Sequence, residues 1–405
     1  MTPREFRWAV DRGMGRAALC LMERDPEPYV PELVQACLKN ARSDTQEESR
    51  ASYLVRLASL AGAEERVLNA VLDALPQCGD GWDGEQLLDL LAEFTAQGHA
   101  RAKAALLAHA HRHEDAVANV ARFGAAALRW LIDTRPELFT EDRKDDAWWW
   151  IEQSIRTSGK EKVEAVLTSA AQAAWQAWQE GIKTPRPELP IPLTSNELAA
   201  MLKDPANEST RRVLAWRFGR SAPLEERERL ARQMLTITKP GLLWILRRAF
   251  EENPWPLDPE PIFSRIDGDD RGAMAWRRVL TPIRHPRVRE FAISRLRQDP
   301  PDVDSVGFLR HNYESGDEDL ILDALRRVNL AELDQIHRIG IDVHWVTKEA
   351  GVEPFVPHLE WVIENGPCSF CRACAFRDMA KAGVLSGAYR REAAYDAESI
   401  IREIA

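Results

Sequence analysis

Three cysteines near the C-terminus, Cys368, Cys371 and Cys374, recur every three residues in the stretch CSFCRACAFRDM. Thiolates at this spacing can ligate a metal or take part in redox chemistry when other groups complete the site. At about 100° per residue, a helix over this stretch places Cys368 and Cys371 on its apolar side and turns Cys374 about 120° away from Cys368. A structural zinc ion needs about four ligands, and the nearest histidine in the sequence is His358. We therefore expect the three thiols to fill a packed helix, with no metal and no cofactor.

Two shorter motifs could also carry chemistry. His109 and His113 share one face of a helix, but Ala110 stands where a zinc protease of this pattern has glutamate directly after its first histidine. Residues 13–18, GMGRAA, fit a loose dinucleotide-binding fingerprint, yet no strand–helix alternation follows to build the sheet that the fingerprint needs. We expect the two glycines to form a turn between two helices.

A run of arginines between residues 271 and 297 reverses the sign of a chain that is acidic overall. Its members are Arg271, Arg277, Arg278, Arg284, Arg287, Arg289, Arg295 and Arg297, and the run contains a single acid, Glu290. Helical geometry points Arg287 and Arg297 outward and sets Arg289 and Arg295 beside the buried arc. The run has two interpretations, a patch that binds an anion or a partner and a solvated structural face. The candidate residues for the patch are Trp276, Arg277, Arg278, Arg284, His285, Arg287 and Arg297.

The elements that must position these residues are short helices. Apolar residues recur at three- and four-residue steps in 54–60, 87–94, 163–167 and 320–328, and no strand-like alternation is sustained. Pairs such as Asp25-Pro26 and Asn253-Pro254 interrupt this periodicity at short intervals. The pattern predicts an all-α chain of short helices joined by tight turns.

Three segments share the pattern Arg-x-x-Ala followed by an apolar residue: 212–218, 289–296 and 372–379. Their first arginines are 77 and 83 residues apart, each about twice the length of one helical-pair repeat. Turns rich in Asp, Asn and Pro precede them. Over residues 195–405 the chain therefore resembles the HEAT-like α-helical repeat family. The resemblance implies a curved α-solenoid of stacked antiparallel helix pairs.

The sequence also suggests a division of the chain. Residues 184–194, TPRPELPIPLT, contain four prolines, which favour an extended backbone and exclude helix. We predict an N-terminal helical region at 1–183, a Pro-rich linker at 184–194 and the HEAT-like repeat region at 195–405. Residues 1–183 have the same helical rhythm but match the repeat pattern less well. They form either degenerate repeats or a separate domain.

Composition narrows the functional classes. The 405 residues are 45% hydrophobic and carry a formal net charge of −10, which disfavours wholesale wrapping of DNA or of an anionic membrane. The N-terminus lacks the apolar core of a signal peptide, and no apolar run approaches the roughly 20 residues needed to cross a bilayer. These features predict a soluble cytoplasmic protein with no membrane partner, whose six sparse cysteines are reduced thiols.

No nucleophile–base or acid–base set stands out in the sequence, which favours a non-catalytic protein. We expect a scaffold that binds a protein or peptide, including an acidic one, through the concave surface of the solenoid. The alternative is a nucleic-acid-binding protein. The resemblance also extends to the HEAT-like DNA glycosylases, whose cleft combines basic residues, tryptophans and a carboxylate. Trp276 and the neighbouring arginines match the first two parts, and no aspartate matches the third.

Overall fold

Every regular element is a helix in the computed structural model, which describes residues 1–41, 49–78, 81–183, 191–202, 208–268 and 270–405. No strand occurs within these ranges, so the prediction of an all-α chain is confirmed. No helix among the described residues is both long enough and apolar enough to cross a bilayer.

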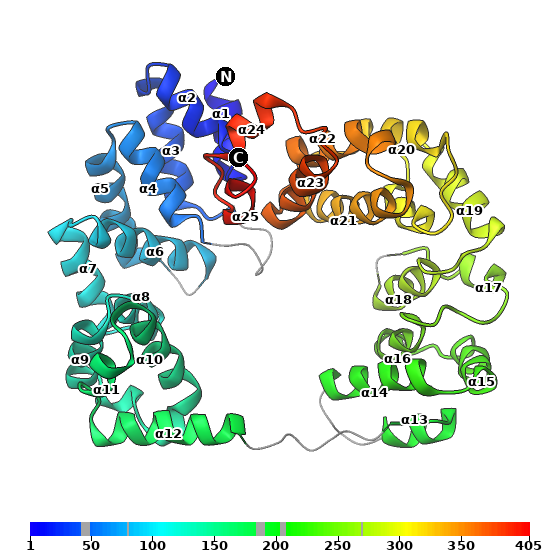
Figure 1. The fold of residues 1–405 in the computed structure, drawn as a ribbon, viewed down its shortest axis with the longest axis horizontal. Helices are drawn as coiled ribbons and strands as arrows, with labels where there is room; N and C mark the ends of the chain where they lie inside the picture. The colour runs from blue at the N-terminus through cyan, green and yellow to red at the C-terminus, as the bar shows by residue number, and fades with distance from the viewer. Residues whose placement is uncertain (42–48, 79–80, 184–190, 203–207, 269) are drawn as a thin grey trace. The chain divides into compact units, whose positions relative to one another are not determined.

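The chain divides into two compact units (Figure 1). The first consists of Met1–Arg186, Cys368–Ala373 and Ser386–Ala405, and the second of Pro187–Pro367 and Cys374–Leu385. Helix α23, Ser369–Lys381, therefore contributes to both units. The predicted linker falls largely on residues 184–190, which lie outside the described ranges, so the predicted division into 1–183, 184–194 and 195–405 stays a prediction.

The first unit is built from short α-helices and single 3-10 turns. They are α1 Pro3–Asp11, α2 Arg16–Glu23, η1 Glu27–Tyr29, α3 Val30–Leu38, α4 Ala51–Leu60, α5 Glu64–Ala74, η2 Leu75–Gln77, α6 Trp82–Ala96, α7 Ala100–Ala110, η3 Glu114–Ala116, α8 Val117–Ala121, α9 Ala125–Thr134, η4 Pro136–Leu138, η5 Glu141–Arg143, α10 Lys144–Ser158, α11 Lys160–Glu164, α12 Ser169–Lys183, α24 Gly387–Ala393 and α25 Ser399–Arg402. Buried apolar side chains from most of these helices form one continuous core.

Local signals set where these helices begin. Thr2 caps α1: its hydroxyl accepts the Glu5 N–H, while the Glu5 carboxylate accepts the Thr2 N–H. Pro3 occupies the first helical position, where a missing N–H has no intrahelical partner to lose. The same reciprocal cap recurs in the second unit at Thr194 and Glu197. These caps satisfy backbone donors that a helix end otherwise leaves open.

Within the first unit, the C-terminal segment lies against the N-terminal helices (Figure 1). The Ala397 N–H donates to the Gly13 carbonyl at 2.8 Å. A Cβ atom at Gly15 would lie 1.9 Å from the Glu392 carbonyl oxygen, so only glycine allows this approach. Gly13 has a φ of +69°, which favours glycine. The GMGRAA motif therefore forms the turn before α2 and makes room for the C-terminal segment.

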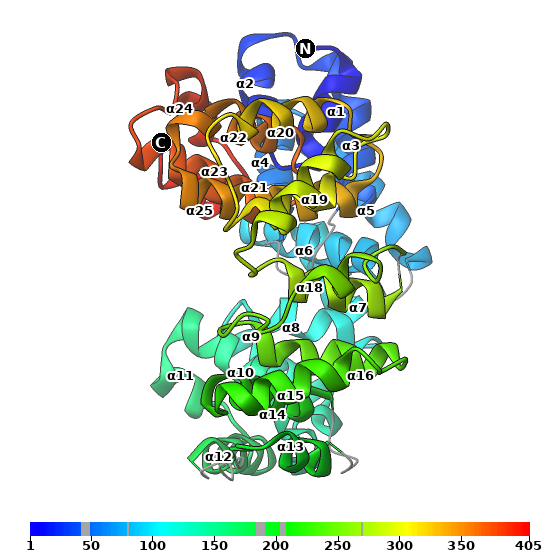
Figure 2. The same ribbon diagram turned by 90° about the vertical axis from the view of Figure 1, so that its right-hand side faces the viewer.

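The second unit continues the helical pattern. Its elements are α13 Ser195–Met201, α14 Glu208–Ser221, α15 Leu224–Met234, α16 Pro240–Leu246, η6 Arg247–Phe250, α17 Glu260–Phe263, α18 Arg271–Leu280, α19 Pro286–Leu296, η7 Val303–Leu309, α20 Asp317–Arg326, α21 Leu333–Ala350, η8 Glu353–Phe355 and α22 Val356–Asn365. In both views, α13 to α16, α18 and α19 follow one another in chain order along the unit (Figures 1 and 2). Elements two apart in the chain pack together, as α13 does with α15 and α14 with α16.

Close helix contacts fill the interior of the second unit. A Cβ atom at Gly219 in α14 would lie 2.1 Å from the Ala249 carbonyl oxygen in η6. The Trp255 and Trp276 rings meet edge to face, with centroids 5.7 Å apart, and both side chains are buried. This packing holds α18, and the arginines that it carries, against the neighbouring helices.

Candidate ligand-binding cavity

The arginine run is largely neutralised by acids from other turns. Its ion pairs in the described part of the chain are Arg271–Glu208, Arg277–Asp304 at 3.0 Å, Arg287–Glu260 at 3.3 Å, Arg287–Glu290 at 2.8 Å, Arg289–Glu314 at 3.2 Å, Arg289–Asp317 at 2.6 Å, Arg295–Asp267 at 2.8 Å and Arg295–Asp302 at 2.5 Å. Seven of these eight acids lie outside the run in sequence, which is why the sequence showed only one acid among these arginines. Most of the run therefore holds adjacent turns together, as the sequence predicts for Arg289 and Arg295.

The remaining candidate residues of the run fall into separate places. Trp276 is 3% exposed, so its ring packs in the core and cannot be part of a surface patch. His285 caps α19 by accepting the Arg287 N–H. Arg284, Arg287 and Arg297 are exposed, as predicted. The other two candidates, Arg277 and Arg278, line a cavity that the sequence did not reveal.

The sequence places Arg289 beside the buried side of α19 and Arg287 on its outer side, and the free energy of unfolding of two variants can test this difference. Arg289 donates two hydrogen bonds to Asp317, at 2.6 and 3.1 Å, and Asp317 is 5% exposed. Arg289→Ala strands this buried carboxylate, and we expect the free energy of unfolding to fall by about 3 kcal/mol. Arg287→Ala removes only exposed ion pairs, so no measurable change is expected. Urea denaturation of both variants tests this contrast, and equal losses would contradict it.

A cavity of about 500 Å³ lies within the second unit. Helices α16, α18, η7 and α21, with the segments that flank them, supply its lining, namely Trp244, Met274, Arg277, Arg278, Thr281, Asp304, Phe308, Glu332, Asp334, Gln335, Arg338, Ile341 and Asp342. Its size suits a small molecule or one or two side chains of a partner. The lining combines an aromatic and apolar wall with charges of both signs, which is the composition of a specific binding pocket.

One carboxylate in the cavity is held by two arginines. Asp304 accepts a hydrogen bond from Arg277 Nη1 at 3.0 Å and two from Arg338, at 3.2 and 3.4 Å. Arg277 Nε also donates to the Ile266 carbonyl at 3.0 Å. These bonds fix the two guanidinium groups beside the cavity, and the trio carries a net charge of about +1.

A second carboxylate, Asp342, lacks such support. Among the described residues it makes no hydrogen bond or close ion pair. It projects from α21 against the backbone of η7, where a Cβ atom at Gly307 would lie 2.8 Å from its Oδ1 atom. The residue is partly exposed at the cavity, but protein atoms surround the carboxyl group, and this burial raises its pKa to about 7. Asp342 therefore exchanges its proton near neutral pH.

Arg278 of α18 lowers the Asp342 pKa more than any other cation does. Arg278 is exposed and forms no ion pair within the described ranges. Trp244 completes the wall, with Arg247 above its ring at 4.0 Å and Arg271 at 5.5 Å. The cavity thus offers the open guanidinium of Arg278, the carboxyl group of Asp342 with its pKa of about 7, and an aromatic surface.

The sequence could supply only part of this cavity. Arg277 and Arg278 were noted because they belong to a dense run. Asp304 and Asp342 were missed because isolated aspartates in helical segments carry no signal of their own. Gly307 offered one indirect signal, since glycine within an apolar helical stretch often marks a close approach.

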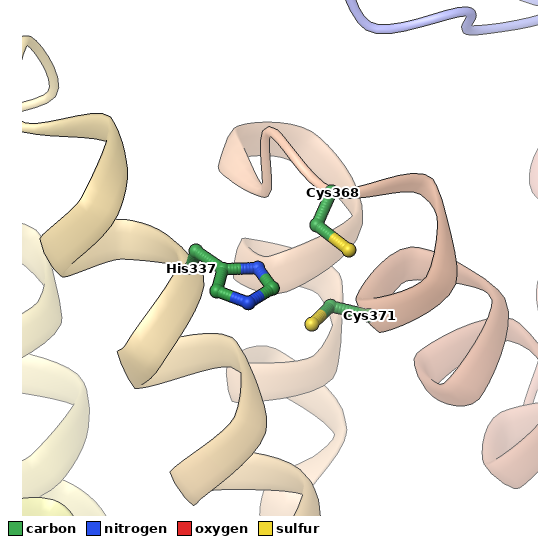
Figure 3. A group of neighbouring side chains, drawn as sticks. All are labelled: His337, Cys368 and Cys371. Atoms are coloured by element: carbon green, nitrogen blue, oxygen red, sulfur yellow. The ribbon is translucent and has the colours of Figure 1, made fainter. Parts of the chain in front are cut away.

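The C-terminal cysteines are buried, at 2%, 6% and 5% exposure for Cys368, Cys371 and Cys374, as the sequence predicts. His337 of α21 offers a ring nitrogen near two of them: the ligand atoms of His337, Cys368 and Cys371 lie within 4.8 Å of one another (Figure 3). These are three ligand atoms, whereas a structural zinc site has about four. The two cysteines belong to the first unit and His337 to the second, so the group is not a site of either unit.

No family model, no curated protein and no solved structure matches this chain.

Proposed function

We propose that the chain is a HEAT-like α-solenoid of stacked antiparallel helix pairs that serves as a non-catalytic scaffold. Its second unit binds an acidic segment of a protein partner at the cavity between α16, α18, η7 and α21. The order of helices α13 to α16, α18 and α19 along the unit supports the solenoid, because successive elements of such arrays pack on their neighbours. The concave surface of the solenoid is the expected location of the cavity.

The observation that carries this proposal is the state of Arg278. Its guanidinium lies at the cavity, is exposed, and has no ion pair among the described residues, whereas Arg277 and Arg338 are held beside it by Asp304. Open arginine donors bind carboxylates through paired hydrogen bonds. The neighbouring Trp244 and Met274 provide contact area for the apolar part of the bound segment.

A protein segment fits this surface better than a nucleic-acid backbone does. Phosphate chains need a continuous row of open cations, and acids occupy most of the arginines between 271 and 297. The alternative of a nucleic-acid-binding or base-excising protein draws support from one observation: Trp244, arginines and the carboxyl group of Asp342 share one cavity.

Affinity purification of the tagged chain from cells that produce it naturally tests the proposal. Partners retained by the wild type should bind the Arg278→Glu variant at least about tenfold more weakly, because the change removes the open cation and adds a like charge. Arg232→Glu is the matched control, since Arg232 lies on α15 of the same unit and is 63% exposed in its side chain. This control should retain the partners.

Two outcomes would contradict the proposal. One is equal recovery of every partner by the wild type and the Arg278→Glu variant. The other is tight binding of a labelled oligonucleotide that weakens steeply with salt and is lost in the Arg278→Glu variant. The second outcome would show that the cavity binds nucleic acid, because a steep salt dependence reports phosphate contacts.

A further inference from the structure

An ionised Asp342 repels an anionic ligand in the cavity, whereas a protonated Asp342 does not. Its carboxyl group lines the same cavity as Arg278 and Arg338, and it rests against Gly307 without a hydrogen bond to any described residue. An ionised Asp342 would place a negative charge beside an incoming carboxylate. Like charges a few ångströms apart in a partly water-excluded site cannot both persist at low free energy.

The charged groups around Asp342 come from every element that packs against it. They are Arg278 of α18, Asp304 of η7, Arg310 directly after η7, and Arg338 of α21 itself. The arginines stay charged over the physiological range, and Asp304 is held by Arg277 and Arg338. No histidine belongs to this set, so Asp342 is the group that changes charge near neutral pH.

We infer that Asp342 is a specificity-determining residue that binds the partner's carboxylate in its protonated form, donating its O–H to the ligand beside the guanidinium of Arg278. This inference rests on the proposed function and names the ligand group as an Asp or Glu side chain. A protonated carboxyl group has one O–H donor, and the arginines contribute further N–H donors. An ionised Asp342 only accepts hydrogen bonds and therefore rejects the same ligand.

The raised pKa of Asp342, about 7, supports this role. At neutral pH a large fraction of the molecules already holds the proton, so little free energy is needed to supply it. A bound carboxylate raises the Asp342 pKa further, because the shared proton then lies between two oxygen atoms. Binding and protonation are coupled, so binding takes up about half a proton at pH 7 and nearly one at pH 8, and it weakens as the pH rises above 7.

A fluorescein-labelled peptide of six glutamates is the probe, and a peptide of six glutamines is its neutral control. Fluorescence anisotropy at constant ionic strength should show that affinity of the wild type for the glutamate peptide falls about fivefold from pH 7 to pH 8, as the protonated fraction of Asp342 falls. The Asp342→Asn variant keeps a hydrogen-bond donor at every pH and should bind equally well at both. Asp334→Asn removes another acid of the same helix and cavity and should keep the wild-type pH dependence.

The results separate this inference from the proposal on which it rests. Binding by the wild type that is equal at pH 7 and pH 8, or an Asp342→Asn variant that keeps the pH dependence, overturns the role of Asp342 alone. No preference for the glutamate peptide over the glutamine peptide at any pH, in all three proteins, contradicts the proposed function.

A measurement without ligand gives an independent check. Folding raises the Asp342 pKa from 3.8 to about 7, so the stabilisation that its proton provides is complete below about pH 3.8 and is lost as the pH rises from there through 7. The melting temperature of the wild type should therefore fall, relative to that of the Asp342→Asn variant, between pH 6 and pH 8. A difference that stays constant over this range shows that Asp342 does not titrate there, which overturns the inference.

Discussion

In the Arg372→Met variant, the free energy of unfolding is expected to fall by about 3–5 kcal/mol. Arg372 is fully buried in the first unit, where its Nη2 atom lies 3.1 and 3.2 Å from the two oxygens of Asp396. Its Nη1 atom also donates to the Arg12 carbonyl. Burial raises the Asp396 pKa to about 6, so this carboxylate is ionised at pH 7.5. Methionine has a similar shape but leaves the charge without its partner.

A double variant isolates the electrostatic cause. In Arg372→Met/Asp396→Leu, both charges are absent, and most of the lost stability should return, because replacing a buried ion pair by apolar side chains is often nearly neutral. Urea denaturation at pH 7.5 compares the wild type with both variants. Equal losses in the single and double variants would show that packing volume, not the stranded charge, accounts for the effect.

The second large effect is expected at Gly219. A Cβ atom there would lie 2.1 Å from the Ala249 carbonyl oxygen and 2.7 Å from its Cα atom. Because these are backbone atoms, they cannot rotate away, and α14 and η6 must separate. We expect Gly219→Ala to lower the free energy of unfolding by about 2–3 kcal/mol.

Gly241 offers the matched control. It lies in α16 of the same unit, and a Cβ atom there would meet nothing within 4 Å. Gly241→Ala should therefore leave stability unchanged or raise it by up to about 1 kcal/mol, since alanine restricts the unfolded chain. Thermal unfolding of the two variants measures the contrast. An equal loss at Gly241 would show that the contact with the Ala249 backbone does not account for the effect at Gly219.

The helical nature of the chain could be predicted because it depends on neighbours three and four residues apart. The apolar periodicity at 54–60 and 87–94 falls within α4 and α6, and that at 320–328 begins in α20 and runs two residues past its end at Arg326. The match is poorer at 163–167, because α11 ends at Glu164. The burial of Cys368, Cys371 and Cys374 could also be predicted from neighbouring residues, because small thiols in a helix with apolar neighbours usually fill a packed interior.

The ion-pair partners of the charged residues could not be predicted from the sequence. The arginines between 271 and 297 were visible as a run, and the outward direction of Arg287 followed from helical geometry. Their acids come from other turns, as Asp317 does for Arg289 and Asp304 for Arg277. The return of the C-terminal segment to Gly13 and Gly15 was equally hidden, because hundreds of residues separate the contacting backbones.

By itself, the sequence determined that this protein is all-α, where many of its helices lie, and that its arginine run is dense. Only the tertiary structure decided that Asp342 faces Arg278, 64 residues away in the chain, and that Gly307 leaves room for its carboxyl group. The physical reason is the distance along the chain over which each interaction acts. Periodicity and capping act over one or two helical turns, whereas the charge and pKa of a cavity depend on which helix faces meet, and that is set by the packing of the whole unit.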